Sequence, residues 1–419
     1  MKFYIEFFTI TEVFMDSSTY QWEIVKRLSS CRPAGSAECE RAADIIADEV
    51  KALGGEVTFE GFTFDFYKID RAVFRVTEPY QKEYTVTGIG YSGNIEGDFK
   101  FRYVERATKF DLDGVDGGIV MMNKLDREQY TSVIKSPAEG FITVNGKFYD
   151  TPENSDLAQG KLGKKIREVG LKPGFFIRTA DGIEIVKKGA SAVHCELEQH
   201  EVTVETKNIV SMIHGTEFPD EYITLSAHYD SVDVGVGAYD NATGVAALLD
   251  LYRYFMENKP KRTMVFLWCG AEERGLLGSQ EFVKKHPEII EKTKFEVNFD
   301  LIGCAIGYDG VSIAAAESVC EFMQKFAADR RHSFEVRRHA ASSDSTSFAD
   351  AGITSFNFYR YGEADIHNRH DVLFPLFEKT LGPTVEFVRD FLIECDKEEV
   401  PFDTVMPEDM AEEVRKYMH

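Results

Sequence analysis

The sequence is short of basic residues and has no apolar stretch long enough to span a membrane. Lys and Arg number 48 against 71 Asp and Glu, so the formal charge is −23. The short basic runs Lys164-Lys165 and Arg330-Arg331 each have an acid close by. Because a surface of this charge repels a phosphate backbone, we expect no nucleic acid as a partner. Because no apolar stretch is long enough to span a membrane, we expect no membrane as a partner either.

The seven cysteines include no C-x-x-C pair, which argues against a thiolate zinc site. Their odd number and scattered positions indicate free thiols and favour the cytoplasm. Residues 1–14 are apolar, but Glu6 and Glu12 interrupt them and no small-residue cleavage site follows. We therefore predict that this segment is not a signal peptide. Met15 is then a candidate for the true start, and secretion is the alternative location.

A chain of 419 residues with 43% apolar content can bury the cores of two domains. Residues 36–53 repeat apolar side chains with a helical period, and residues 56–80 alternate as short strands. From about residue 80 to 205 the sequence is rich in Gly and turns, which predicts an inserted β-rich domain. We expect a catalytic domain in two parts, residues 15–74 and 204–397, with the insertion at residues 75–203 between them. Residues 398–419 are expected to form a solvated, acidic helical tail.

From Asn208 onward, apolar strands alternate with helical patterns. The expected strands are 209–213, 222–227, 264–268, 295–301 and 354–359. The expected helices are 242–257, 278–285, 318–330 and 384–394. This alternation predicts the α/β class, as a three-layer sandwich with a mixed, largely parallel central sheet flanked by helices. Ligands in such folds gather beyond the C-terminal ends of the strands.

Two polar residues come directly after the expected strand 222–227. His228 and Asp230 stand at alternate positions there, so their side chains point the same way. A histidine at a strand end is more often a hydrogen-bonded structural residue than a metal ligand. If His228 is a ligand, Asp230 is placed to accept its other ring N–H and fix the tautomer.

Three further segments place acids at strand ends or turns. Asp240 ends a glycine-rich turn before helix 242–257, where a helix N-cap would explain it without a metal. Glu272 and Glu273 follow strand 264–268, and adjacent side chains diverge, so one can bind a metal while the other moves protons. Asp300 lies in an apolar strand, where it needs a partner such as a cation, a lysine or a backbone donor.

The last candidate metal ligand is a histidine. His367 and His370 both follow strand 354–359, and either can be a ligand on chemistry alone. One tetrahedral zinc with an open position needs only three protein ligands. Two ions about 3.5–4 Å apart that share a carboxylate would use all five candidates. The sequence therefore predicts two divalent metal ions, with Zn²⁺ favoured by the mixed imidazole and carboxylate donors and Co²⁺ or Mn²⁺ as alternatives.

The segments that carry these residues resemble the co-catalytic two-zinc aminopeptidase family, whose relatives include glutamate carboxypeptidases and glutaminyl cyclases. The matching segments occur in the family's order: His228-Tyr229-Asp230-Ser231, Asp240-Asn241-Ala242-Thr243-Gly244, Gly270 to Ser279, Asn298-Phe299-Asp300 and His367-x-x-x-Asp371. The resemblance implies one zinc on His228 and Asp300, the other on Glu273 and His367, Asp240 as the bridge and Glu272 as the general base. It also selects His367 over His370.

The sequence departs from this family at two positions. Ser345 replaces a usual histidine, and Ile366 stands where several relatives have a tyrosine that donates to the transition-state oxyanion. Tyr359 or Tyr361 is a candidate replacement for that tyrosine. The insertion is loosely similar to a protease-associated domain, and a β-rich insertion with no separate role is the alternative.

The resemblance implies a metallo-exopeptidase that removes N-terminal residues from peptides. A free amino terminus suits an anionic, metal-bearing pocket, whereas a carboxypeptidase needs a basic residue, for which Arg274, Arg360 and Arg369 are candidates. A glutaminyl cyclase-type transferase and a non-enzymatic binding protein on the same fold are further alternatives. The sequence indicates neither the side-chain preference nor the oligomeric state.

Overall fold

The computed structural model describes residues 15–157 and 159–418, which divide into two compact units. The first unit contains the described residues up to Phe62 and from Glu205 onward, and the second is Thr63–Val204. The chain passes between them in strands β1 (Thr58–Glu78) and β9 (Ala192–Ile213). The short strands expected over residues 56–80 are therefore wrong, because this segment forms one long strand.

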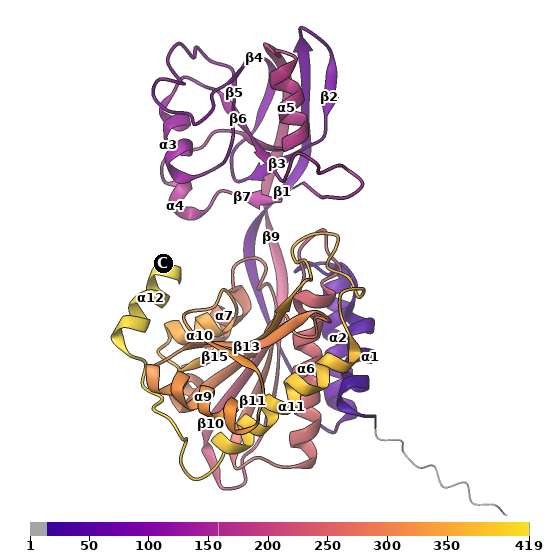
Figure 1. The fold of residues 1–419 in the computed structure, drawn as a ribbon, viewed down its shortest axis with the longest axis vertical. Helices are drawn as coiled ribbons and strands as arrows, with labels where there is room; N and C mark the ends of the chain where they lie inside the picture. The colour runs from indigo at the N-terminus through magenta and orange to yellow at the C-terminus, as the bar shows by residue number, and fades with distance from the viewer. Residues whose placement is uncertain (1–14, 158, 419) are drawn as a thin grey trace, which may run out of the picture. The chain divides into compact units, whose positions relative to one another are not determined.

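The sheet of the first unit is mixed and largely parallel, which confirms the predicted α/β class. Its strand order is β14-β13-β15-β12-β10-β11-β9 (Figure 1). The bounds are Phe218–His228 for β10, Arg262–Cys269 for β11, Thr293–Phe299 for β12, Gly307–Ala314 for β13, Phe334–Arg338 for β14 and Ser355–Gly362 for β15. Parallel pairing sets His228 opposite Cys269, so the segments after β10 and β11 leave the sheet at the same edge.

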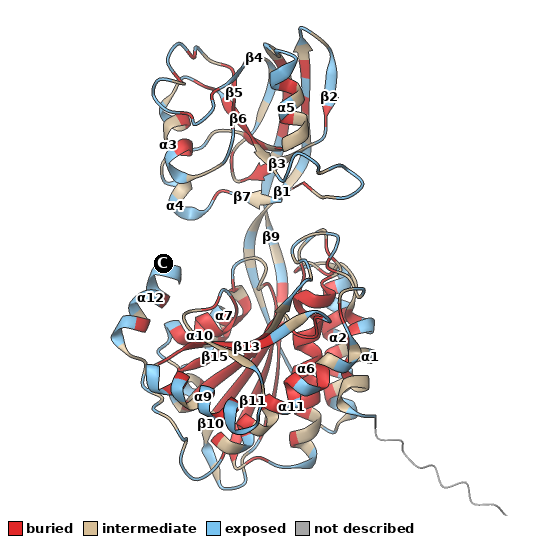
Figure 2. Ribbon diagram, viewed as in Figure 1, coloured by how far each residue is buried: buried red, intermediate tan, exposed pale blue. Residues whose placement is uncertain are grey.

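Helices cover both faces of this sheet. One face packs against α1 (Ser17–Leu28), α2 (Ala37–Ala52), α6 (Thr243–Glu257), α9 (Glu317–Asp329) and α11 (Glu378–Cys395). The other packs against α7 (Leu277–Lys285), α8 (Pro287–Lys292) and α10 (Ser345–Asp350). Helix α6 is buried over most of its length (Figure 2), because it lies between the sheet and the outer helices α1 and α2.

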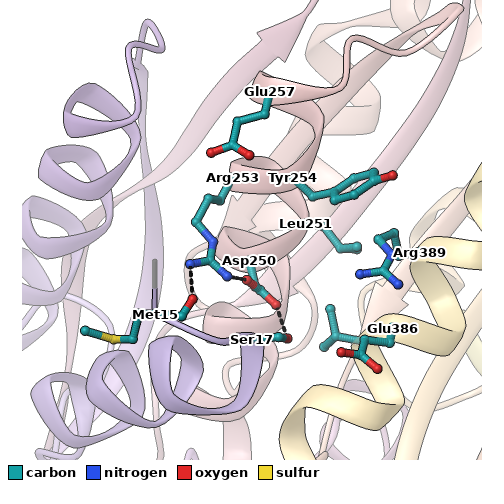
Figure 3. Close-up of a pocket in the computed structure, with 10 residues that line it drawn as sticks. Met15, Ser17, Asp250, Leu251, Arg253, Tyr254, Glu257, Glu386 and Arg389 are labelled. Atoms are coloured by element: carbon teal, nitrogen blue, oxygen red, sulfur yellow. Dashed lines mark hydrogen bonds and ion pairs between the residues drawn. The ribbon is translucent and has the colours of Figure 1, made fainter. Parts of the chain in front are cut away.

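A buried carboxylate fixes α1 on α6. Asp250 accepts hydrogen bonds from Ser17, from Gln21 Nε2 at 3.1 Å and from Arg253 Nη2 at 2.7 Å. Arg253 also donates to the backbone oxygen of Met15 at 2.9 Å, and Figure 3 shows Met15, Ser17 and Arg253 around Asp250. Residues 15–28 are thus an integral part of the first unit, although the sequence pattern did not predict a helix there.

Asp250→Asn should destabilise the protein by about 1–3 kcal/mol, since it removes a charged acceptor that three buried or half-buried donors share. Urea unfolding followed by circular dichroism measures the change. Asp329→Asn is the matched control, because Asp329 pairs with Lys325 on the surface and such pairs contribute about 0–1 kcal/mol. Equal stability of the two variants would contradict the anchoring role of Asp250.

The C-terminal segment was expected to be solvated, and the structure corrects this. Helix α12 (Glu408–Met418) buries Met410 and Val414 against Ala314 and Ala349. The spacing of four residues places both side chains on one face of the helix. Strands β13 and β14 and helices α8 and α10 were also missing from the prediction, because short elements give weak periodic signals.

The second unit contains both strands and helices. Its strands are β2 (Lys82–Tyr84), β3 (Val86–Gly90), β4 (Ile95–Tyr103), β5 (Ile119–Met122), β6 (Gly140–Asn145), β7 (Gly160–Lys161) and β8 (Gly174–Arg178). Helices α3 (Arg127–Lys135), α4 (Lys164–Arg167) and α5 (Thr179–Lys187) accompany them. Strands β4, β5, β6 and β8 pair in parallel and support two apolar clusters. Its likeness to a protease-associated domain stays a prediction.

Within residues 15–157 and 159–418, no helix combines the length and apolar character needed to cross a lipid bilayer. All seven cysteines lie in this part of the chain and are unpaired. Residues 1–14, interpreted above as something other than a signal peptide, lie outside the described residues. The cytoplasmic location stays a prediction.

Candidate metal centre

Two histidines from distant segments face the two oxygens of one carboxylate. His228 Nε2 lies 3.1 Å from Asp240 Oδ1, and His367 Nε2 lies 3.1 Å from Asp240 Oδ2. His228 ends strand β10, Asp240 lies in the short π-helical turn η1 (Ala238–Ala242), and His367 is in the loop after β15. The structure thus places Asp240 between the two imidazoles.

The remaining acids sort into two clusters around this carboxylate. His228, Glu272 and Asp300 form one cluster, and Asp240, Glu273 and His367 form the other. Asp300 Oδ1 is 3.6 Å from His228 Nε2, and Glu273 Oε2 is 3.2 Å from His367 Nε2. The adjacent residues Glu272 and Glu273 therefore lie in different clusters.

The donor atoms of these residues fit divalent metal ions. Within the described residues, His228 Nε2, Glu273 Oε1 and Asp300 Oδ1 are buried and have no hydrogen-bond partner. Leaving buried polar atoms without partners is costly, so a ligand is expected there. Imidazole nitrogen and carboxylate oxygen are both zinc donors, and the five candidate residues can serve two ions through a shared carboxylate.

The charges of the acids act strongly on the two imidazoles. Hydrogen bonds that His367 donates to the carboxylates of Asp240 and Glu273 raise its pKa to about 11. Burial alone would lower the pKa of His228, but Glu272 and the other nearby carboxylates outweigh it and raise that pKa well above 6.5. Without metal, the imidazole of His367 therefore holds a second proton at neutral pH.

Metal binding should release protons, because a ligating imidazole must be neutral. Since the pKa of His367 without metal is about 11, the apparent affinity should rise with pH throughout the neutral range and fall on acidification. Calorimetric titration of metal-free protein with Zn²⁺, in buffers of different ionisation enthalpy, counts the protons. His367→Ala should release about one fewer, and binding without proton release would contradict this account.

The N-cap alternative for Asp240 is wrong. The N-cap residue of α6 is Ala242, and the side-chain acceptor near its start is Asn241, whose Oδ1 accepts from Gly244 N at 2.9 Å. The backbone around Asp240 is held by Asp371, whose Oδ1 accepts from Tyr239 N at 2.7 Å and whose Oδ2 accepts from Asp240 N at 3.1 Å. The sequence analysis assigned Asp371 no role, although its spacing from His367 was the available signal.

The role predicted for Asp230 needs a correction. His228 Nδ1 is 3.2 Å from the backbone oxygen of Asp230 but 3.7 Å from its carboxylate, which is too long for a hydrogen bond. The carboxylate instead accepts from the backbone N–H groups of Glu272 at 3.0 Å and Glu273 at 3.3 Å. Asp230 therefore positions the Glu-Glu segment, as Asp371 positions Asp240.

A fully buried arginine holds the loop between His228 and Asp240. Arg32 donates from Nε to the backbone oxygen of Tyr229 at 2.6 Å and from Nη2 to that of Gly237 at 2.8 Å. Its Nη1 reaches the backbone oxygen of Val236 at 2.6 Å. The sequence analysis gave Arg32 no role, since these contacts join residues about 200 positions apart.

His370 is exposed, belongs to neither cluster and donates its backbone N–H to Asn368 Oδ1 at 2.7 Å. Among the residues proposed for the carboxylate of a peptide, Arg274 makes two hydrogen bonds to Asp233, at 3.0 and 2.7 Å. Arg360 donates to the backbone oxygen of Cys304 at 2.8 Å and to Asp309 at 3.3 Å.

Residues 208–392, which contain all five candidate ligands and Glu272, match the sequence profile described as Peptidase family M28. This part of the chain is thus similar to peptidase family M28. A stretch of 117 residues is 36% identical to a probable zinc metalloprotease of Pyrenophora tritici-repentis and covers 26% of this chain and 27% of that protein. Another stretch, of 167 residues, is 33% identical to an aminopeptidase of Pseudomonas aeruginosa and covers 40% of this chain and 30% of that protein.

The likeness to curated relatives is confined to part of their length, because the matched segments span about a quarter to a third of those proteins. A structural match, in contrast, extends over most of this chain. The structure of a zinc aminopeptidase from Bacillus subtilis superposes with a TM-score of 0.78 at 20% identity, covering 94% of this chain and 98% of that one. This match confirms the fold predicted for the chain.

Proposed function

We propose that this protein is a zinc-dependent aminopeptidase with two metal ions. The observation that carries the proposal is the position of Asp240, whose two oxygens each lie 3.1 Å from a different imidazole. His228 and Asp300 would hold one ion, Glu273 and His367 the other, and Asp240 both. When bound, two such ions polarise a peptide carbonyl and lower the pKa of a water near neutrality.

Glu272 is the general base in this proposal. Burial raises its pKa well above 4.5, and the charges of Asp344, Asp300 and Glu273 raise it further against the opposing effect of His228. A carboxylate with a raised pKa accepts a proton from the attacking water more readily than an ordinary one. Glu272 then donates this proton to the leaving amine.

The charge around the site favours a substrate with a free amino terminus. Arg274 and Arg360, two of the three candidates for a carboxylate-binding residue, are engaged by Asp233 and by Cys304 and Asp309. The acids of both clusters suit a cationic ammonium group better than an anionic carboxylate. These contacts support an aminopeptidase over a carboxypeptidase.

A panel of aminoacyl-p-nitroanilides, with and without an acetyl group on the amino terminus, tests the substrate class. Cleavage of the free substrates only, lost on chelation and restored by Zn²⁺, is expected. Cleavage confined to acetylated peptides with a free carboxylate would support a carboxypeptidase instead. A metal-loaded protein inactive on both series would overturn the proposal in favour of a cyclase or a binding protein.

Tyr361 is our candidate for the oxyanion donor that Ile366 cannot supply. Tyr359 is buried and its hydroxyl already donates to Glu335 at 3.0 Å. Tyr361 is half-buried, stacks on Tyr359 at 3.9 Å and has its pKa raised to about 12 by burial and then by the charge of Asp300. It therefore keeps its proton at neutral pH.

Tyr361→Phe should lower kcat by about 10²-fold, the lower end of the loss seen when one oxyanion donor is removed. KM and metal content should stay near wild type, because the ring and its stacking are kept. Tyr359→Phe is the control and should change kcat by less than a few fold. Steady-state kinetics of both variants test the assignment of Tyr361. Equal losses of kcat in the two variants would contradict it.

A further inference from the structure

Arg360 in strand β15 joins the segments next to two candidate metal ligands. Its backbone N–H donates to the oxygen of Leu301, the residue after Asp300, at 2.8 Å. Its backbone oxygen accepts from the hydroxyl of Tyr239, the residue before Asp240, at 2.7 Å. The backbone of Arg360 thus bonds to the residue after Asp300 and to the residue before Asp240.

The Arg360 side chain extends this connection. Its Nε donates to the backbone oxygen of Cys304 at 2.8 Å. Cys304 lies in the middle of the loop that runs from Asp300 to β13, and this loop pairs with the segments before and after His367. The pairing consists of the bonds Glu363 N to Ile306 O at 3.0 Å, Ala305 N to Pro375 O at 2.9 Å and Phe377 N to Gly303 O at 3.0 Å.

A buried carboxylate holds the guanidinium in this direction. Asp309 Oδ1 lies 3.3 Å from Arg360 Nη1 and accepts from Thr384 Oγ1 at 2.9 Å, while its Oδ2 is 3.0 Å from His332 Nε2. The side chains of Arg360 and Asp309 are only 17% and 9% exposed. Since a half-buried guanidinium bonded to a buried carboxylate has few alternative positions, the bond to Cys304 has a defined geometry.

The backbone next to the site requires such support. Leu301 and His367 both adopt a left-handed conformation, with φ of 66° and 59°. Non-glycine residues keep such conformations only where the surrounding contacts impose them. The carbonyl of Leu301 is held by Arg360 itself, and the segment that carries His367 is joined to the Cys304 loop.

We propose that Arg360, held by Asp309, is a positioning residue that sets the geometry and affinity of the metal centre. Its side chain holds the loop after Asp300 through Cys304, and this fixes the strand position from which its backbone bonds to Leu301 and Tyr239. This inference rests on the proposed two-metal function, and it assigns Arg360 to the metal centre and not to the binding of a substrate carboxylate.

Metal-free wild type, Arg360→Met, Arg360→Lys and Asp309→Asn are titrated with Zn²⁺ against a chromophoric chelator and with Co²⁺ followed by visible absorption. We expect the Met variant to bind at least one ion about 10–100-fold more weakly, as for lost partners of metal ligands, and to change the Co²⁺ spectrum. Arg360→Lys and Asp309→Asn should show smaller changes of the same kind, and these carry the test if the Met variant does not fold.

Arg262→Met is the matched control for general destabilisation. Arg262 is also buried and donates to backbone oxygens, those of Lys397 and Glu398 among them, but it begins β11 at the end opposite the candidate site. It should lose thermal stability without changing metal affinity or the spectrum. Wild-type affinity and spectrum in all three Arg360 and Asp309 variants would overturn the inference alone. Absence of metal binding by the wild type would overturn the proposed function as well.

Discussion

Glu272→Gln should lower kcat by about 10²–10⁴-fold while two metal ions stay bound. Gln keeps the size of the side chain but cannot accept the proton of the attacking water. The backbone N–H at residue 272 is held by Asp230 at 3.0 Å, so the substitution should not move the segment. Steady-state kinetics on a free aminoacyl-p-nitroanilide, with metal analysis of the same samples, measure both quantities.

The adjacent variant Glu273→Gln is the control. Glu273 Oε2 lies 3.2 Å from His367 Nε2, in the other cluster, so this variant should lose metal as well as activity. The two variants thus separate proton transfer from metal binding at neighbouring positions. If Glu272→Gln lost an ion while Glu273→Gln kept both, the roles of the two carboxylates would have to be exchanged.

Asp240→Asn should abolish detectable peptidase activity and weaken metal binding by more than about 100-fold, the upper end of the loss expected for a partner outside the coordination shell. Burial acts to raise the pKa of Asp240, but its contacts with His228 and His367 outweigh burial and hold the pKa below 3.8. Asn offers a single oxygen acceptor and no charge, so it cannot bind both metal ions.

Asp371→Asn should have a smaller effect on metal binding than Asp240→Asn, and the two variants are compared. Asp371 holds the backbone N–H groups of Tyr239 and Asp240 but belongs to neither cluster. Its loss should weaken metal binding by about 10–100-fold and leave measurable activity at saturating Zn²⁺. Competition with a chromophoric chelator gives the affinities of both variants. Two tightly bound ions in Asp240→Asn would refute the bridging role.

The placement of the candidate ligands at strand ends was predictable because it is encoded locally. Apolar runs of strand length, such as those before His228 and Glu272, are followed by polar residues that cannot stay in the core. Parallel strands end at one edge of a sheet, so the α/β class already implied that these residues meet. The fold class is confirmed, and the ligand assignment stays a prediction.

Other features had no local signal. Strand β13 and helix α1 were missed, and the tail around Met410 was expected to be solvated, since a short or charged segment shows its buried face only when its partner is known. Asp230 was assigned to His228, two residues away. Its carboxylate instead bonds to Glu272, 42 positions along the chain, because backbone N–H groups there need an acceptor.

The sequence by itself determined the alternation of the longer strands and helices after residue 208, the α/β class and the residue types that gather at the strand ends. These follow from hydrophobic periodicity, which each segment carries on its own. Only the tertiary structure decided that Asp240 lies between two imidazoles, that Asp371 holds its backbone 131 positions away and that Arg360 joins the surrounding loops. Such contacts depend on hydrogen-bond partners that chain folding alone brings within reach.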